Sequence, residues 1–243
     1  MRRIALALVS SLLASQTASA DPSWSTIGIT TTASNAPQVV AATDKLMGSE
    51  VGKTFPGKLL LQVNAADGAN PATHTFVPIY KTVADREAFV QKLQGSPAWA
   101  EFQTTLERIS QPGGTVMYQT LKHWGNVNDT DDVWMVHAFT VEDPAAFVTA
   151  LDAFMASATG QKFPGQVYLS GVVAGGMTPV THIISVGYES ETEMAGWTAV
   201  RDASADWATY QQASRPTGKY LGGSLARDIK TWGTATLAEI VAP

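Results

Sequence analysis

The sequence predicts an α+β protein made of two tandem βαββαβ units, and three observations lead to this prediction. Phe55-Pro56-Gly57 returns 108 residues later as Phe163-Pro164-Gly165. The same offset relates Trp124-Gly125 to Trp232-Gly233, with no gap needed in between. In both halves, β-branched runs alternate with apolar residues at helical spacing. Further pairs at this offset are Thr73-His74 and Thr181-His182, Tyr80 and Tyr188, Ser96 and Ser204, Trp99 and Trp207, and Gly114 and Gly222.

These matches place the two units at residues 22–125 and 131–233, joined by the polar segment 126–130. Before residue 54 the match is weaker. Trp24 meets Trp134 only if the offset grows to 110 residues, and Thr30 then meets Thr140. We therefore expect a two-residue gap near the first strand of the repeat.

The elements are clearest in the second unit. Val133 to Thr140 is β-branched and aromatic, which favours a strand. Asp143-Pro144 is a helix start, and apolar residues then recur at helical spacing. Strands follow at 166–173 and 181–188. Ser190 and Glu193 form a capping-box pattern for a helix that breaks near Ser204, and the last strand ends at Trp232.

The first unit follows the same order. We expect strands at 26–32, 58–64, 73–82 and 115–124, and helices at 38–47, 85–93 and 96–109. Pro78 cannot donate a ladder hydrogen bond, so the sequence predicts a bulge there. A βαββαβ unit forms a four-stranded antiparallel sheet with its helices on one face. Two units in one chain can bury their bare sheet faces against each other.

The first 20 residues indicate a signal peptide. Arg2 and Arg3 precede an apolar run, and Ala18-Ser19-Ala20 is a signal-peptidase pattern. We expect cleavage before Asp21 and a periplasmic or secreted protein. No later apolar run has the length of a membrane span. The chain has no cysteine and a formal charge of −5, and cleavage removes two arginines, so disulfides are excluded and nucleic-acid binding is disfavoured.

Matched polar residues of the third strand are the first candidates for catalysis. His74 and Tyr80 point to one face if the strand alternates regularly, and so do His182 and Tyr188. Such residues can handle protons and hydrogen bond a substrate. The alternative is a structural histidine that hydrogen bonds a backbone carbonyl at a sheet end, which a duplication preserves in both halves.

Two histidines lack a counterpart and are candidate pocket residues. His123 aligns with Thr231, whereas His137 aligns with Ile27 or Ile29. A protein with a single site keeps its special residue in one half only, although each is also compatible with an ordinary core or rim position. Two further candidates, Trp99 and Trp207, line a pocket or pack in the core.

Other chemistries find no support. The acidic residues Asp129, Asp131 and Asp132 lack calcium-loop spacing, so we expect a solvated linker and no metal site. The chain has no phosphate-binding glycine loop, no zinc-protease motif and no serine-hydrolase elbow.

The doubled βαββαβ order resembles the dimeric α/β-barrel superfamily, with its antibiotic-biosynthesis-monooxygenase-like members. A Ser-x-x-Trp-x-x-aromatic element late in each unit adds to the resemblance. It stands here as Ser96, Trp99 and Phe102, and as Ser204, Trp207 and Tyr210. The resemblance covers nearly the whole mature chain and implies ferredoxin-like units that form one barrel within the chain. Its motifs carry no catalytic signature.

The resemblance implies several activities, because the fold alone does not choose among them. The first is binding of a small apolar or aromatic ligand, with cofactor-independent monooxygenation as the enzymatic form. The alternative cofactor is haem, as in two-repeat chlorite-dismutase-like and peroxidase-like members, with His137 or His182 as axial ligand. The third is a non-catalytic structural or stress-associated module. Either a monomer or a homodimer is compatible with the sequence.

Overall fold

The computed structural model describes residues 21–68, 70–176 and 179–242. The predicted signal peptide at residues 1–20 lies outside this part of the chain. The first half contains β1 (Ser23–Thr31), α1 (Ala36–Met47), β2 (Lys58–Ala66), β3 (His74–Tyr80), α2 (Val83–Gln94), α3 (Pro97–Ile109) and β4 (Ser110–Gly125). The second contains β5 (Val133–Val141), α4 (Pro144–Met155), β6 (Gln166–Ala174), β7 (His182–Tyr188), α5 (Glu191–Asp202), α6 (Ala205–Ser214) and β8 (Gly218–Trp232). A short C-terminal helix, α7 (Leu237–Val241), and two 3₁₀ turns, Gly52–Thr54 and Gly160–Lys162, complete the described elements.

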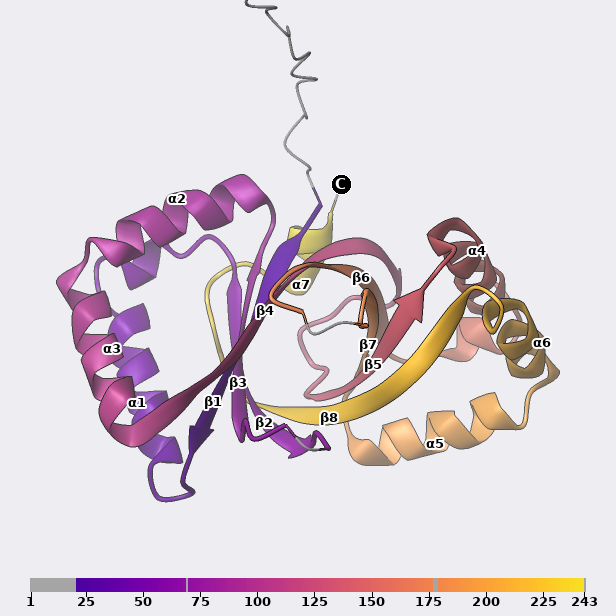
Figure 1. Cartoon of the computed structure of the whole chain (residues 1–243), viewed down its shortest axis with the longest axis horizontal. Helices are drawn as coiled ribbons and strands as arrows, with labels where there is room; N and C mark the ends of the chain where they lie inside the picture. The colour runs from indigo at the N-terminus through magenta and orange to yellow at the C-terminus, as the bar shows by residue number, and fades with distance from the viewer. Residues whose placement is uncertain (1–20, 69, 177–178, 243) are drawn as a thin grey trace, which may run out of the picture.

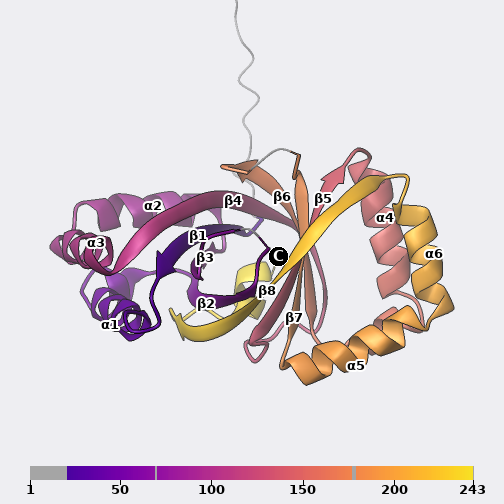
Figure 2. The same ribbon diagram turned by 60° about the horizontal axis from the view of Figure 1, so that its bottom comes forward.

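The eight strands form one closed antiparallel barrel in the order β1-β3-β2-β8-β5-β7-β6-β4. Within each half the four strands pair with one another, and the β2–β8 and β4–β6 pairs join the halves. Helices α1 to α3 cover the outside of one half and α4 to α6 cover the outside of the other (Figures 1 and 2). The wall of the barrel therefore has an outer face under the helices and an inner face that lines the lumen.

Local sequence explains why the late helices begin where they do. Ser96 accepts a hydrogen bond from the backbone N–H of Trp99 at 3.1 Å, and Ser204 does the same for Trp207 at 3.0 Å. Each serine is the N-cap that the repeat analysis pairs, and a capping oxygen satisfies one of the free donors of a helix start. The predicted break near Ser204 is where α5 ends and α6 begins.

The repeated Phe-Pro-Gly turn is required by close backbone packing. A Cβ on Gly57 would lie 2.0 Å from the carbonyl oxygen of Ile79, and one on Gly165 would lie 2.1 Å from that of Gly187. Only glycine permits this approach. The turn thus brings β2 against β3, and β6 against β7, in both halves.

The predicted bulge at Pro78 is wrong. The β1–β3 and β2–β3 registers run through this strand without a shift. The β1–β3 ladder instead lacks its pairs at Ser25 and Thr26, opposite Pro78 and Val77, and resumes in the same register at Ile27. Because proline has no N–H, the strand loses ladder hydrogen bonds here, but no extra residue is inserted as it would be in a bulge.

Two main clusters of apolar residues lie between the barrel wall and the helices. The larger belongs to the second half and includes Phe147, Leu151, Phe154, Leu169 and Trp197. In the first half, Val39, Leu46, Leu61, Phe76 and Phe102 take the corresponding role. Burial of these side chains fixes the helices on the outer face of the barrel.

The acidic linker is solvated only in part: Asp129 and Asp132 are exposed, as expected, whereas Asp131 is not. Asp131 is buried, and its carboxylate accepts a hydrogen bond from Gln166 Nε2 at 2.9 Å. Asp129 accepts from Lys58 Nζ at 2.5 Å and from the backbone N–H of Leu237 at 3.1 Å. The linker therefore joins β2, β6 and α7 at one end of the barrel.

Candidate functional site

His137 lies on β5 with its side chain on the outer face of the wall, toward α5. It is opposite Ile184 on β7 and Gly223 on β8. Burial, reinforced by the positive charge of Arg201, lowers the pKa of His137 to about 4. The imidazole is therefore neutral near pH 7 and has one nitrogen that accepts a hydrogen bond.

A bulge in β8 brings Tyr220 to the same face. The β5–β8 register shifts between Ala138 and Phe139, so Phe139 pairs with Tyr220 while Ala138 pairs with Gly222. The Tyr220 ring lies 5.9 Å from the His137 ring and 5.5 Å from the Phe139 ring, centroid to centroid. Tyr220 is 55 % exposed, so its hydroxyl is reachable from solvent.

Gly223 lies beneath these two residues and has no side chain to crowd them. A Cβ at this position would lie 3.1 Å from the hydroxyl oxygen of Tyr220 and 3.3 Å from Nδ1 of His137. Gly223 is itself exposed. A side chain here would also lie 3.1 Å from the carbonyl oxygen of Val136, so glycine is what lets the phenol hydroxyl and the imidazole lie close together over the strand.

Arg201 supplies the positive charge of this region. It extends from α5, with its guanidinium carbon 4.6 Å from the centre of the Trp207 ring. Its Nη2 lies 2.8 Å from the carboxylate of Asp202, and the side chain is 21 % exposed. An arginine that stacks on an indole is held in one orientation while its charge still acts on its surroundings. This charge adds to the lowering of the His137 pKa, and it opposes the rise that burial causes in the pKa of Tyr188.

The first half has no such group of residues. The strand registers place Ile27 where His137 stands, Thr115 where Gly223 stands and Pro112 where Tyr220 stands. At the offset of the repeat, Leu93 corresponds to Arg201. We name His137, Arg201, Tyr220 and Gly223 the β5–α5 site. It is a polar group that only one of the two repeats carries.

The structure does not bring together the matched residues of the third strand. His74 and Tyr80 are six residues apart on β3, a separation of about 20 Å along a strand. Nδ1 of His74 lies 2.9 Å from the hydroxyl of Thr73, and His182 repeats this contact with Thr181 at 2.9 Å. The partner is thus the preceding threonine, not a carbonyl. Burial lowers the pKa of both histidines.

The two tyrosines of this pair lie in aromatic packing. Tyr80 meets Phe55 edge to face at 5.3 Å, and Tyr188 meets Phe163 in the same way at 5.6 Å. Burial raises the pKa of each phenol to about 12. Both remain protonated near pH 7, and their rings serve the core of each half.

The remaining candidates are dispersed. His123 is exposed near the end of β4, on the lumen side, 6.3 Å from the Tyr168 ring. Trp99 stacks on Phe102 at 5.4 Å in the first half, away from the β5–α5 site. Trp207 stacks on Tyr210 at 4.8 Å and carries Arg201 on its ring. Of the predicted pocket residues, His137 and Trp207 are therefore the two that the fold connects, through Arg201.

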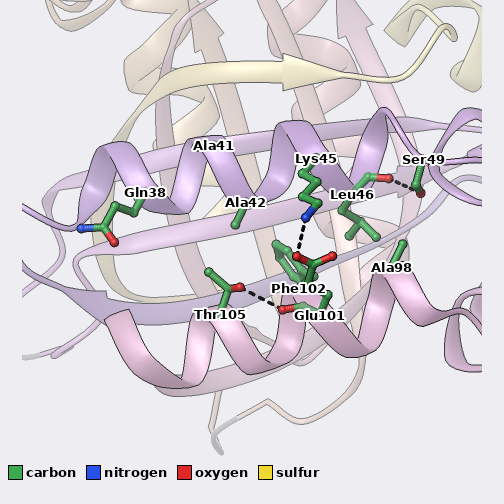
Figure 3. Close-up of a pocket in the computed structure, with 10 residues that line it drawn as sticks. All are labelled: Gln38, Ala41, Ala42, Lys45, Leu46, Ser49, Ala98, Glu101, Phe102 and Thr105. Carbon is green, nitrogen blue, oxygen red and sulfur yellow. Dashed lines mark hydrogen bonds and ion pairs between the residues drawn. The ribbon is translucent and has the colours of Figure 1, made fainter.

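A groove of about 350 Å³ lies between α1 and α3 on the outside of the first half (Figure 3). Leu46 and Phe102 line it, and the ion pair of Lys45 and Glu101 spans it. In the second half, Phe154 stands at the position of Leu46 and packs against Trp207 at 5.2 Å. The groove follows from the smaller Leu46, and its charged residues, Lys45 and Glu101, are exposed and paired with each other.

Comparison with known proteins supports the fold. No protein-family model and no curated protein matches the chain. A structure from Lactobacillus acidophilus NCFM, described provisionally as a monooxygenase, superposes with a TM-score of 0.62 at 12 % identity, over 89 % of this chain and 97 % of that one. An anthrone oxidase-like protein gives 0.53 at 12 % identity, over 88 % and 93 %. The chain has the dimeric α/β-barrel fold.

A chlorite dismutase has a similar fold. A mutant chlorite dismutase from Candidatus Nitrospira defluvii gives a TM-score of 0.51 at 12 % identity, over 92 % of this chain and 95 % of that one. At sequence identities this low, the similarity supports the dimeric α/β-barrel fold and does not extend to function. The residues of the β5–α5 site therefore carry the functional argument.

Sequence reasoning named His137 but missed Arg201, Tyr220 and Gly223. A usable signal was present in the repeat itself. At each of these positions the two halves differ in polarity or size, with isoleucine, leucine, proline and threonine in the first half. A search for such differences, in place of matched residues, points to the β5–α5 site.

Proposed function

We propose that this chain binds one small aromatic molecule with an acidic hydroxyl at the β5–α5 site, and oxygenates it without a cofactor. The observation that carries the proposal is the close approach of Tyr220 and His137 over Gly223, within the field of Arg201. A hydroxyl donor, a neutral imidazole and a fixed cation suit a ligand that becomes an anion. Nearby aromatic rings of Phe139 and Trp207 suit its apolar part.

The site residues would divide the work of oxygenation. Arg201 stabilises the anion of the substrate, and Tyr220 donates a hydrogen bond to its oxygen. His137 is a weak base when the site is empty. A bound anion raises its pKa, because negative charge favours the imidazolium, so His137 accepts the proton as the anion forms.

Dioxygen is the oxidant in this proposal. The substrate anion gives electrons to dioxygen and forms a carbon–oxygen bond, and His137 returns the proton to the resulting peroxide. Loss of water then leaves a carbonyl. For a methylene group beside an aromatic ring the sum is CH₂ + O₂ → C=O + H₂O, which needs no other reductant.

Haem is the alternative cofactor, and the packing around His137 argues against it. A porphyrin placed against His137 would have to displace the Tyr220 ring, which lies 5.9 Å away and also contacts Phe139. Phe139 in turn packs on Phe147, a fully buried residue. These residues fit a smaller ligand better than haem.

We further propose export to the periplasm or the medium, on the evidence of Arg2, Arg3 and the Ala18-Ser19-Ala20 pattern. In the part of the chain that the structure describes, no helix is long and apolar enough to cross a membrane. The mass of the protein recovered from the periplasm tests this proposal. Cleavage before Asp21 is the expected result, and an uncleaved N-terminus would contradict it.

The binding experiment uses 1-naphthol as the probe, followed by its fluorescence, with the purified mature protein. His137→Ile and Arg201→Leu give the second half the residues of the first, and each should weaken binding at least tenfold. His182→Gln is the matched control and should leave binding unchanged. Equal affinity in all four proteins would refute the β5–α5 site.

Two further measurements distinguish oxygenation from ligand binding alone and from haem binding. Oxygen uptake with anthrone as substrate, lost in His137→Ile, supports oxygenation. Binding of 1-naphthol without uptake of oxygen limits the protein to ligand binding. A Soret band in the purified protein would replace both readings with the haem alternative.

A further inference from the structure

The contact between the first and last helix of each half is closed in the second half. Phe154 of α4 meets Trp207 of α6 edge to face, with 5.2 Å between the ring centres. Next to this pair, the carboxylate of Asp206 on α6 accepts a hydrogen bond from the backbone N–H of Thr159 at 3.0 Å, in the turn that follows α4. A ring and a carboxylate therefore join the two helices.

The first half lacks both groups. At the offset of the repeat, Leu46 corresponds to Phe154 and Ala98 corresponds to Asp206. The backbone N–H of Val51 matches the donor that Asp206 binds, and it makes no hydrogen bond within the part of the chain that the structure describes. The first half therefore has a groove between α1 and α3, and beside it a backbone donor without an acceptor.

The groove has room for an aromatic ring with a short acidic chain. Its volume is about 350 Å³, whereas a cavity of about 150 Å³ is enough for benzene. Leu46 and Phe102, both largely buried, line it. Figure 3 shows Leu46, Ser49 and Ala98 toward the same end of the groove. A ring placed on Leu46 can therefore direct an acid group toward Ala98.

We infer that the groove between α1 and α3 binds a small aromatic carboxylate. Its ring takes the place that the Phe154 ring fills in the second half. Its carboxylate takes the place of Asp206 and accepts a hydrogen bond from the N–H of Val51. This site is independent of the proposed function, because it lies in the other half of the chain. It requires a carboxylate, which 1-naphthol lacks, so it does not add to the stoichiometry of 1-naphthol.

The second half shows that the turn after the first helix favours an ionised carboxylate. Hydrogen bonds from the side chain and then the backbone of Thr159 lower the pKa of Asp206. Val51 offers the backbone N–H without a hydroxyl. Lys45 compensates for this, because it lines the groove where Ala153 stands in the second half. The first half thus adds a positive charge where the carboxylate side chain is missing.

The ammonium of Lys45 is available to a ligand. It pairs with Glu101 across the groove, but the two side chains are 69 % and 55 % exposed. An exposed ion pair of flexible side chains contributes little to stability, because water screens it and both chains lose freedom. A ligand carboxylate can therefore replace Glu101 as the partner of Lys45 at small cost.

The experiment titrates sodium 3-phenylpropanoate into the full mature protein and measures the heat of binding. We expect one molecule per chain. Leu46→Phe and Ala98→Asp give the first half the side chains of the second, so each should keep the fold and weaken binding at least tenfold. Ala100→Asp is the matched control, because it adds the same charge at an exposed position of α3 that does not line the groove. It should bind normally.

Two variants test the assigned charges. Lys45→Ala should weaken binding, because it removes the cation that pairs with the carboxylate. Glu101→Gln should tighten binding at least twofold, because it frees the ammonium and removes a repelling charge. Weaker binding in both variants would contradict the role given to Lys45, since it would show that the ion pair itself is needed.

Three outcomes would overturn the inference: no saturable binding of 3-phenylpropanoate, equal affinity in Ala98→Asp, or equal affinity for uncharged 3-phenylpropan-1-ol. If Ala98→Asp fails to fold, Leu46→Phe decides in the same way. Loss of 3-phenylpropanoate binding in the double variant His137→Ile, Arg201→Leu would place the ligand at the β5–α5 site and would also contradict the inference. Retained 1-naphthol binding in Ala98→Asp is expected, because the two sites are separate.

Discussion

His137 gives the most direct link between the structure and a solution measurement. Its pKa falls from an ordinary value of 6.5 to about 4, first because of burial and then because of Arg201. A histidine that resists protonation when folded stabilises the protein above pH 6.5, and this stability is lost as the pH falls from 6.5 toward 4. Each pKa unit is worth about 1.4 kcal/mol, so the loss is at most about 3 kcal/mol.

The assay is urea unfolding of the mature protein and of His137→Gln at pH 7, 6, 5 and 4. Carboxyl groups also titrate in this range, and comparison with the variant removes their contribution. We expect the unaltered protein to lose up to about 3 kcal/mol more than His137→Gln between pH 7 and pH 4. Parallel stability curves would refute both the burial of the imidazole and the field of Arg201.

Three further predictions concern other parts of the barrel. The pKa of Asp228 is raised to about 7, so its contribution to stability falls as the pH rises from 4 to 7, opposite to that of His137. The loss is up to about 4 kcal/mol, and Asp228→Asn should remove it in urea unfolding. Phe147→Ala removes a fully buried ring and should cost about 3–5 kcal/mol in the same assay, while Phe147→Leu should cost less. Gly223→Val should push the Tyr220 hydroxyl away from His137, weaken 1-naphthol binding and lower the melting temperature, because its Cβ would lie 3.1 Å from the carbonyl oxygen of Val136; tight binding by this variant would contradict the geometry.

The repeat explains why the fold could be predicted so fully. A motif such as Phe55-Pro56-Gly57 recurs because the same close approach of two strands is needed twice. The serine caps of α3 and α6 are likewise local features that sequence displays directly. Even the gap near the first strand agrees with the registers, since Thr30 and Thr140 donate to the carbonyls of Pro71 and Pro179.

Bulges were not predictable in the same way. The structure has none at Pro78 but places one in β4 at Leu121 and its counterpart in β8 at Ile229. These residues are 49 % and 43 % exposed. A bulge is set by the twist needed to close eight strands into a barrel, which depends on strands far apart in sequence.

The β5–α5 site and the partners of the linker aspartates could not be predicted from the sequence for a related reason. Tyr220 reaches His137 only because β8 bulges, and Arg201 does so only because α5 lies on that part of the wall. Asp129 and Asp131 looked like linker residues because their partners, Lys58 and Gln166, are distant in sequence. Pairs of this kind are products of the closed barrel.

The central claim is that the chain binds its aromatic ligand at one site, in the second half. The most direct test is the stoichiometry of 1-naphthol binding to the mature protein, measured by isothermal titration calorimetry beside the double variant His137→Ile, Arg201→Leu. One molecule per chain, and none in the double variant, is the result the structure predicts. Two equivalent molecules per chain, or one that persists in the double variant, would show that the ligand follows the duplicated framework and not the residues that distinguish its second half.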